Sequence, residues 1–310
     1  MHHKISPYQM GVWLVTAFAG PIIYFADGNW LYMLVLGSIL SLLCYLAVHY
    51  GRHWKGKTYA VAQLLWVTVL LSQLAPYSAK CWPTGENVFP IIPLTLLFLA
   101  GCAAVNGVKG AANGLGVLFW GAALLLCVVI LSGVGDIKGD WLFPQYQFPQ
   151  EAILLVFLLP ALPGLLGIGV NKVYAALPVL AAGISAWIAG SISPALSEQV
   201  DWPFYEAAKS AQLLDVAKRF EALVSVGVTI GNFALYAMLF SAAYQMGENF
   251  GRGRDAVFLS GTLASLLMLF RVTLPMGVLI VGSFVFWIWL PLLSLIKISQ
   301  IRLKNDENSP

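Results

Sequence analysis

The sequence predicts an all-α polytopic membrane protein with about ten transmembrane helices. The chain of 310 residues is 59% hydrophobic and only 10% charged, and its mean hydropathy is +0.80. Charged residues make up about 25% of an ordinary soluble domain, so the composition leaves no room for a separate one. We therefore predict a single integral membrane domain over residues 1–310, with the lipid bilayer as its surroundings.

Ten apolar runs are long enough to cross the hydrocarbon core, which is about 30 Å thick. The predicted spans are residues 10–26, 30–49, 59–75, 89–105, 115–134, 143–170, 173–192, 222–246, 256–272 and 276–296. The first residues are too polar for a signal peptide, so the first run is expected to remain as a span. With the N-terminus inside, eleven of the 17 Lys and Arg residues fall on the inner side. This distribution favours both termini on the cytoplasmic side.

Two of these spans are interrupted at matching positions in the two halves of the chain. The first span contains Gly20-Pro21, and the sixth contains Phe148-Pro149-Gln150-Glu151. A broken helix leaves N–H and C=O groups that lipid cannot satisfy, so a break must pack in protein or line a cavity. Paired breaks point to a small-solute site near the membrane midplane. Because each half holds five spans, we predict an inverted five-plus-five repeat, with halves at residues 8–135 and 140–297.

The first break is predicted to bind a ligand through backbone N–H groups. It comprises Ala17, Phe18, Ala19, Gly20 and Pro21. Proline removes an N–H donor and glycine permits a sharp bend. The freed N–H groups at the start of the outer half-helix would suit a substrate carboxylate. The alternative is an ordinary proline kink that contacts no ligand.

The second break, which comprises Phe148, Pro149, Gln150 and Glu151, adds a carboxylate. Glu151 follows Asp140 by eleven residues, which places it about 16 Å into the membrane at a rise of about 1.5 Å per residue. A charged carboxylate at that depth costs about 2.5–3.5 kcal/mol. We expect Glu151 to bind a substrate ammonium group or to couple protons. The alternative is that it only caps the second half-helix, whose dipole favours a negative charge there.

Polar groups on the third and eighth spans complete the predicted site. Trp66 lies on the third span, while Asn232 and Tyr236 are four residues apart on the eighth and share a helical face. The alternative role for each is a hydrogen bond between helices. Four tryptophans near span ends are predicted instead to anchor the chain at the membrane interface. They are Trp30, Trp82, Trp141 and Trp202.

The connection between the seventh and eighth spans is predicted to contain an amphipathic helix over residues 203–221. Its apolar residues recur at helical spacing against charged ones, and it is too charged to span. We expect it to pack on the outer mouth of the bundle as a lid. A helix that lies flat in the membrane interface is the alternative.

No constellation in the sequence suits an enzyme, a metal site or a cofactor. Four cysteines lack the spacing of metal ligands, and neither a nucleophile–base pair nor paired intramembrane carboxylates are present. Residues 107–114 are rich in glycine but are predicted to form a short inner turn rather than a phosphate loop. The net charge of +3 is modest, so we predict no nucleic-acid partner. The cysteines are Cys44, Cys81, Cys102 and Cys127.

Three stretches give the chain a resemblance to a known family. Ile5-Ser6-Pro7-Tyr8-Gln9 leads directly into the first span, and the second break is followed by residues 154–160, Leu-Leu-Val-Phe-Leu-Leu-Pro. Trp202-Pro203-Phe204-Tyr205-Glu206 opens the segment before the eighth span, and residues 219–223, Arg-Phe-Glu-Ala-Leu, close it. Together these resemble GerAB-type spore germination proteins, the membrane-embedded subunits of germinant receptors within the amino acid–polyamine–organocation (APC) superfamily.

The resemblance implies a LeuT-like fold with broken first and sixth helices. It also implies a subunit that senses an amino acid in the inner membrane of the spore of an endospore-forming bacterium. Such a subunit would work beside a larger membrane subunit and a lipoprotein subunit. A proton-coupled amino acid or amine permease of the same superfamily is the alternative, and the pocket residues alone do not separate the two.

Overall fold

The computed structural model describes residues 5–50, 56–80, 82, 90–142, 151–166, 172–197, 199–200, 202–210 and 220–293. Within these ranges every regular element is a helix and there is no strand. The α-helices are α1 (Pro7–Phe25), α2 (Trp30–Tyr50), α3 (Lys57–Lys80), α4 (Ile91–Val105), α5 (Val108–Gly133), α6 (Ala152–Leu158), α7 (Leu162–Leu165), α8 (Val173–Ser191), α9 (Pro194–Ser197), α10 (Pro203–Ser210), α11 (Phe220–Glu248), α12 (Gly253–Leu269) and α13 (Met276–Phe284). The 3₁₀ helices are η3 (Val134–Asp136), η4 (Gly139–Leu142) and η5 (Leu159–Ala161), and the π-helical turn η6 (Val285–Trp289) continues α13.

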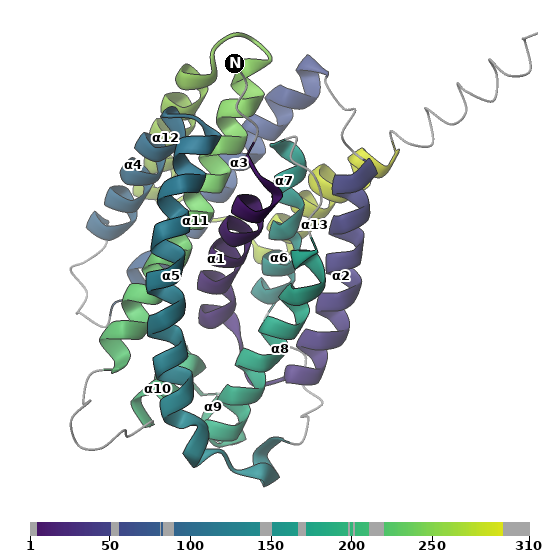
Figure 1. The fold of residues 1–310 in the computed structure, drawn as a ribbon. Helices are drawn as coiled ribbons and strands as arrows, with labels where there is room; N and C mark the ends of the chain where they lie inside the picture. Colours follow the sequence, from purple (N-terminus) through teal and green to yellow (C-terminus); the bar gives the residue numbers. More distant parts are fainter. Residues whose placement is uncertain are drawn as a thin grey trace, which may run out of the picture.

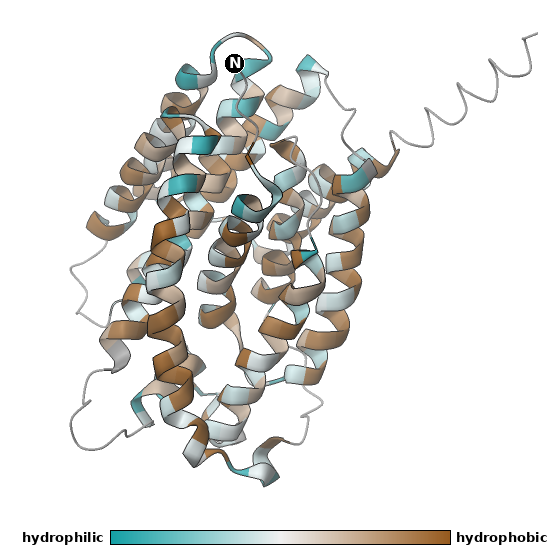
Figure 2. Cartoon of the chain, viewed as in Figure 1, coloured by the Kyte–Doolittle hydropathy of each residue, from teal (hydrophilic) through white to brown (hydrophobic). Residues whose placement is uncertain are grey.

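The helices form an elongated bundle with the character of a helical membrane protein (Figure 1). Within the described ranges, seven helices are long and apolar enough to cross a membrane, and they correspond to predicted spans 1, 2, 3, 5, 7, 8 and 10. The fourth and sixth predicted spans contain shorter apolar helices, and the ninth is α12, with 17 residues. Hydrophobic residues dominate the helix shafts, while many hydrophilic residues gather near the end where α1 begins (Figure 2).

The long helix α11 is the centre of the bundle. It packs against α1, α3, α4, α5 and α12, and its middle residues, 234–243, are almost all buried. On the other flank α2 packs along α8. The short helices α9 and α10 lie at the end of the bundle opposite the start of α1 (Figure 1).

The expected interruption of the first span at Gly20-Pro21 is wrong, because α1 is one continuous α-helix from Pro7 to Phe25. Pro21 lies inside it and removes only the single hydrogen bond that its missing N–H would have donated to the carbonyl of Ala17. The helix ends later, at Phe25, and the following residue, Ala26, has extended backbone angles. Packing on α11 outweighs the local tendency of the Gly-Pro pair to break the helix.

The same glycine brings α1 and α11 into backbone contact. A methyl group added to Gly20 would lie 2.8 Å from the carbonyl carbon of Gly231, and one added to Gly231 would lie 2.5 Å from the Cα of Gly20. Both positions therefore require glycine for steric reasons. Small residues at such crossings allow membrane helices to approach closely.

The sixth span is irregular at a position beyond the predicted break. Residues 143–150 lie outside the described ranges, but α6, η5 and α7 follow one another with changes of helix type between them. Pro160 and Pro163 have no N–H to donate, which interrupts the regular hydrogen-bond ladder. Neighbouring helices supply donors to this segment. The Cys44 thiol of α2 lies 3.5 Å from the carbonyl oxygen of Phe157, and the Tyr174 hydroxyl of α8 donates to the carbonyl of Pro160 at 2.6 Å.

Two connecting segments differ from those predicted. Residues 108–114 belong to α5 rather than to a turn, and Asn106 and Gly107, the latter with φ of +86°, connect α4 to α5. Of the predicted amphipathic helix, residues 203–210 form α10, while residues 211–219 lie outside the described ranges. The apolar side of α10 is buried against α5, α8 and α11, so this part packs on the bundle.

Replacing Gly231 with alanine should destabilise the fold by about 1–3 kcal/mol, because the new methyl group meets the backbone of α1 and no side chain can move aside. Thermal unfolding of the purified protein in detergent measures this. Gly183→Ala in α8 is the matched control, since a methyl group there meets nothing within 4 Å. Equal melting temperatures for the two variants would contradict the close crossing.

Replacing Tyr174 with phenylalanine should cost about 1–3 kcal/mol, because it leaves the buried carbonyl of Pro160 without its donor. Tyr45→Phe is the control. The Tyr45 ring lies 6.1 Å from that of Tyr174, yet its hydroxyl makes no hydrogen bond among the described residues. Unfolding measured by circular dichroism should separate the two variants, and a loss of equal size in both would argue against this role for Tyr174.

Candidate functional site

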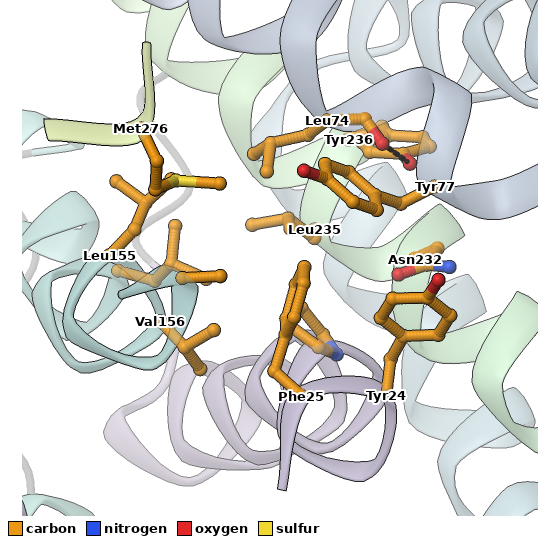
Figure 3. A pocket seen from close by; sticks show the side chains of 13 residues that line it. Tyr24, Phe25, Leu74, Tyr77, Leu155, Val156, Asn232, Leu235, Tyr236 and Met276 are labelled. Atoms are coloured by element: carbon orange, nitrogen blue, oxygen red, sulfur yellow. Dashed lines mark hydrogen bonds between the residues drawn. The ribbon is translucent and has the colours of Figure 1, made fainter. Parts of the chain in front are cut away.

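A small cavity lies where α1, α3, α6, α11 and α13 meet (Figure 3). Its volume is about 20 Å³, which is room for about one water molecule. Most of its walls are apolar, and its polar groups come from tyrosine hydroxyls and one side-chain amide. The lining residues are Pro21, Tyr24, Phe25, Leu74, Tyr77, Ala152, Leu155, Val156, Leu159, Asn232, Leu235, Tyr236 and Met276.

Three of the residues predicted for the site line this cavity: Pro21, Asn232 and Tyr236. The hydroxyl of Tyr236 donates to the carbonyl of Leu74 at 2.9 Å, so it joins α11 to α3. This is the hydrogen bond between helices that was the alternative prediction for Tyr236. Asn232 is 6% exposed, and its amide carries both donors and an acceptor. In Figure 3 its side chain lies near Tyr24 of α1 and Tyr77 of α3.

The second break reaches the cavity through the start of α6. Ala152 lines the cavity and directly follows Glu151. Glu151 itself is exposed, and its carboxylate makes no hydrogen bond that caps α6. The predicted site residues Phe148, Pro149 and Gln150 lie outside the described ranges.

Four of the five residues predicted at the first break pack between helices and do not line the cavity. Phe18 is fully buried, with its ring 5.6 Å from that of Phe157 in α6, and Gly20 forms the crossing with α11. Ala17 and Ala19 also lie outside the lining. Because α1 stays helical, its backbone N–H groups near Gly20 are not freed for a carboxylate, which removes the physical basis of that expectation.

Trp66 also does not line the cavity. Its indole N–H donates to the hydroxyl of Ser283 at 3.2 Å, and its ring stacks on Phe286 with centroids 5.5 Å apart. Trp66 therefore holds α3 against α13, where the π-helical turn begins.

An aromatic cluster that the sequence reasoning missed forms one wall of the cavity. Tyr24 and Phe25 at the end of α1 face Tyr77 of α3, with ring centroids 5.8 and 5.1 Å from it. All three rings project toward the cavity in Figure 3. The third span was predicted to end at residue 75, but α3 continues to Lys80. Reading that span one turn further would have brought Tyr77 into consideration.

Trp202 ties the segment before α10 to this cluster. Its indole N–H donates to the carbonyl of Ile23 at 3.1 Å, which is one of the last carbonyls of α1 and has no partner within the helix. Its ring lies 5.6 Å from Tyr24 and 4.9 Å from Tyr205. The prediction that Trp202 anchors the chain at the membrane interface is therefore wrong, since the residue is 8% exposed and packs inside the bundle.

The lining of the cavity could orient a small molecule. Among the described residues there is no group of His, Cys, Asp or Glu side chains that could hold a metal ion. The cavity combines apolar walls with a few polar groups that could fix the orientation of a ligand. At about 20 Å³ it is too small for anything larger than water, so binding of a larger ligand requires its walls to separate.

No protein-family model matches the chain, and no curated protein matches it.

Replacing Trp202 with phenylalanine keeps an aromatic ring but removes the donor to Ile23. We expect faster backbone hydrogen exchange in residues 203–210, because the last turn of α1 loses its cap and α10 loses an attachment, at a cost of about 1 kcal/mol. Trp120→Phe in α5, whose side chain is 64% exposed, is the control. Unchanged exchange in residues 203–210 would show that the indole does not hold this segment.

Proposed function

We propose that this chain is the membrane-embedded subunit of a nutrient receptor that binds a small zwitterion, an amino acid, near the membrane midplane. The receptor would be a spore germinant receptor, in which a larger membrane subunit and a lipoprotein subunit receive the signal. The cavity carries the proposal, because Pro21 of the first predicted break and Ala152, which directly follows the second, meet Asn232 there. The type of receptor, the membrane in which it lies and its partner subunits are proposed from the resemblance to GerAB-type proteins.

Much of the helix packing agrees with the inverted repeat that underlies this proposal, although the contact of α1 with α11 has no comparable counterpart between α3 and α6 among the described residues. An inverted repeat relates each of the first five spans to one of the second five. The related helices are α1 and α6, α2 and α8, α3 and α11, α4 and α12, and α5 and α13. When related helices are exchanged, the contact of α4 with α11 becomes that of α12 with α3, and the contact of α1 with α5 becomes that of α6 with α13. All four are present. Contacts of α2 with α8, α3 with α11 and α4 with α12 map onto themselves, and all are present.

The direction of the chain agrees with an even number of crossings. In Figure 1 the last described helix ends near the same end of the bundle from which α1 starts. We place that end on the cytoplasmic side, which in the spore is the core side, because most of the basic residues of the sequence fall there.

The closed cavity suggests how such a receptor would signal. A ligand that enters must separate α1 and α3 from α6, and this would disturb the contacts of Tyr24 with Tyr77 and with Trp202. Ligand binding would then shift the population from the closed state toward a more open one. The segment around α10 would move with it, since Trp202 is bonded to the end of α1.

A permease with the same architecture is the second candidate, because inverted repeats around a midplane site are the usual basis of alternating access. Reconstitution in liposomes with labelled amino acids separates the two. Binding without concentrative uptake by the protein alone supports the receptor. Robust concentrative uptake would replace the receptor with the permease.

The binding site itself is tested by thermal shift with each of the standard amino acids, since a ligand that binds the folded state raises its stability. Asn232→Leu removes the amide at nearly constant size, and we expect it to weaken binding at least about tenfold, or about 1.4 kcal/mol. Ser241→Ala, in the same helix and away from the cavity lining, should bind normally. Equal affinities in the two variants would exclude this cavity as the binding site.

Glu151→Gln tests the carboxylate separately. Loss of binding with normal protein levels is expected if Glu151 receives the ammonium group of the ligand. An unchanged dependence of the response on ligand concentration would show that Glu151 is not part of the site, and it would not contradict the proposal that the ligand binds in the cavity.

A further inference from the structure

A second and much larger hollow lies on the flank of the bundle, away from the cavity. It is a groove of about 720 Å³ between α4 and α12, and the ring of Phe240 in α11 lies at its floor. Gly101 in α4 and Gly261 in α12 face it from opposite walls. A methyl group added to Gly101 would have no neighbour closer than 3.9 Å, so the missing side chains keep the groove open.

The groove has the length of one leaflet of a bilayer. Along α4 it runs from Leu94 to Asn106, which is about 18 Å at a rise of about 1.5 Å per residue. Half of the hydrocarbon core is about 15 Å. Most of its lining is apolar, from Leu94, Leu97 and Val105 on one side to Val257 and Leu266 on the other. These dimensions fit an extended acyl chain.

One mouth of the groove is flanked by exposed cations. Lys109 lies one turn beyond Asn106, and Arg254 lies one turn before Val257, with Arg252 just ahead of it. Two carboxylates, Glu248 and Asp255, are also exposed in the same connection. The only ion pair among the described residues joins Lys209 to Glu206, so none of the three cations forms an ion pair with a described carboxylate.

We propose that this groove binds an anionic phospholipid, with an acyl chain between α4 and α12 and the phosphate at Lys109, Arg252 and Arg254. Basic clusters at the ends of membrane helices attract anionic headgroups, and an apolar slot as long as a leaflet holds the tail. A transmembrane helix of a partner would also find small residues here. The cations and the single-leaflet length favour the lipid.

The native cysteines provide the test. Cys102 lines the groove and Cys127 lies on α5, and both are exposed free thiols. The full chain in mild detergent is labelled with a maleimide, and each cysteine peptide is quantified by mass spectrometry. Added phosphatidylglycerol should slow labelling of Cys102 at least about tenfold without changing Cys127, and phosphatidylcholine should protect less. Equal labelling of Cys102 with and without phosphatidylglycerol would overturn the proposal.

Groove-filling variants complete the test. Native mass spectrometry should detect retained phosphatidylglycerol on the unaltered protein and on Gly121→Leu, whose side chain enters open space on α5, but not on Gly101→Leu. Thr262→Leu fills the opposite wall and serves if Gly101→Leu does not fold. Retention by both groove variants would overturn the lipid site. The lipid site would also be overturned if protection of Cys102 increased with protein concentration and not with lipid concentration, since the occupant would then be a second copy of the chain.

Discussion

The contact of Gly20 with Gly231 is the constraint on which the centre of this structure depends. It sets the distance between α1 and the central helix α11, and a methyl group on either glycine would collide with the backbone of the other helix. The next residue along each helix, Pro21 and Asn232, faces the cavity. The crossing therefore determines both how tightly the bundle closes and which side chains meet at the proposed site.

A second constraint is that lipid cannot satisfy free backbone groups. At two places where a helix ends or changes type inside the protein, a side chain from a distant part of the chain donates to a carbonyl that the helix leaves free. Tyr174 donates to the carbonyl of Pro160 in the irregular sixth span, and Trp202 donates to the carbonyl of Ile23 at the end of α1. These side chains join distant helices to the cavity walls, so a movement of the cavity walls would also displace the segment around α10.

The helical class and the positions of most helices could be predicted from apolar runs, because hydropathy and length alone define a membrane span. Gly20-Pro21 misled the prediction, since its role depends on Gly231, a residue more than two hundred positions away that no local pattern connects to it. Asn232 was predicted from its polarity within an apolar helix and lines the cavity. Tyr24 and Tyr77 were missed because their meeting follows from how α1 and α3 pack, which spacing along the chain does not encode.

The central claim is that a small zwitterion binds where α1, α3, α6 and α11 meet. The most direct measurement is a structure of the full chain in lipid nanodiscs, determined with the amino acid that gives the largest thermal shift. The account predicts that this amino acid lies between Pro21, Ala152 and Asn232, in a cavity wider than the present 20 Å³, with the rings of Tyr24 and Tyr77 moved apart. An amino acid bound elsewhere while this cavity stays closed would contradict it.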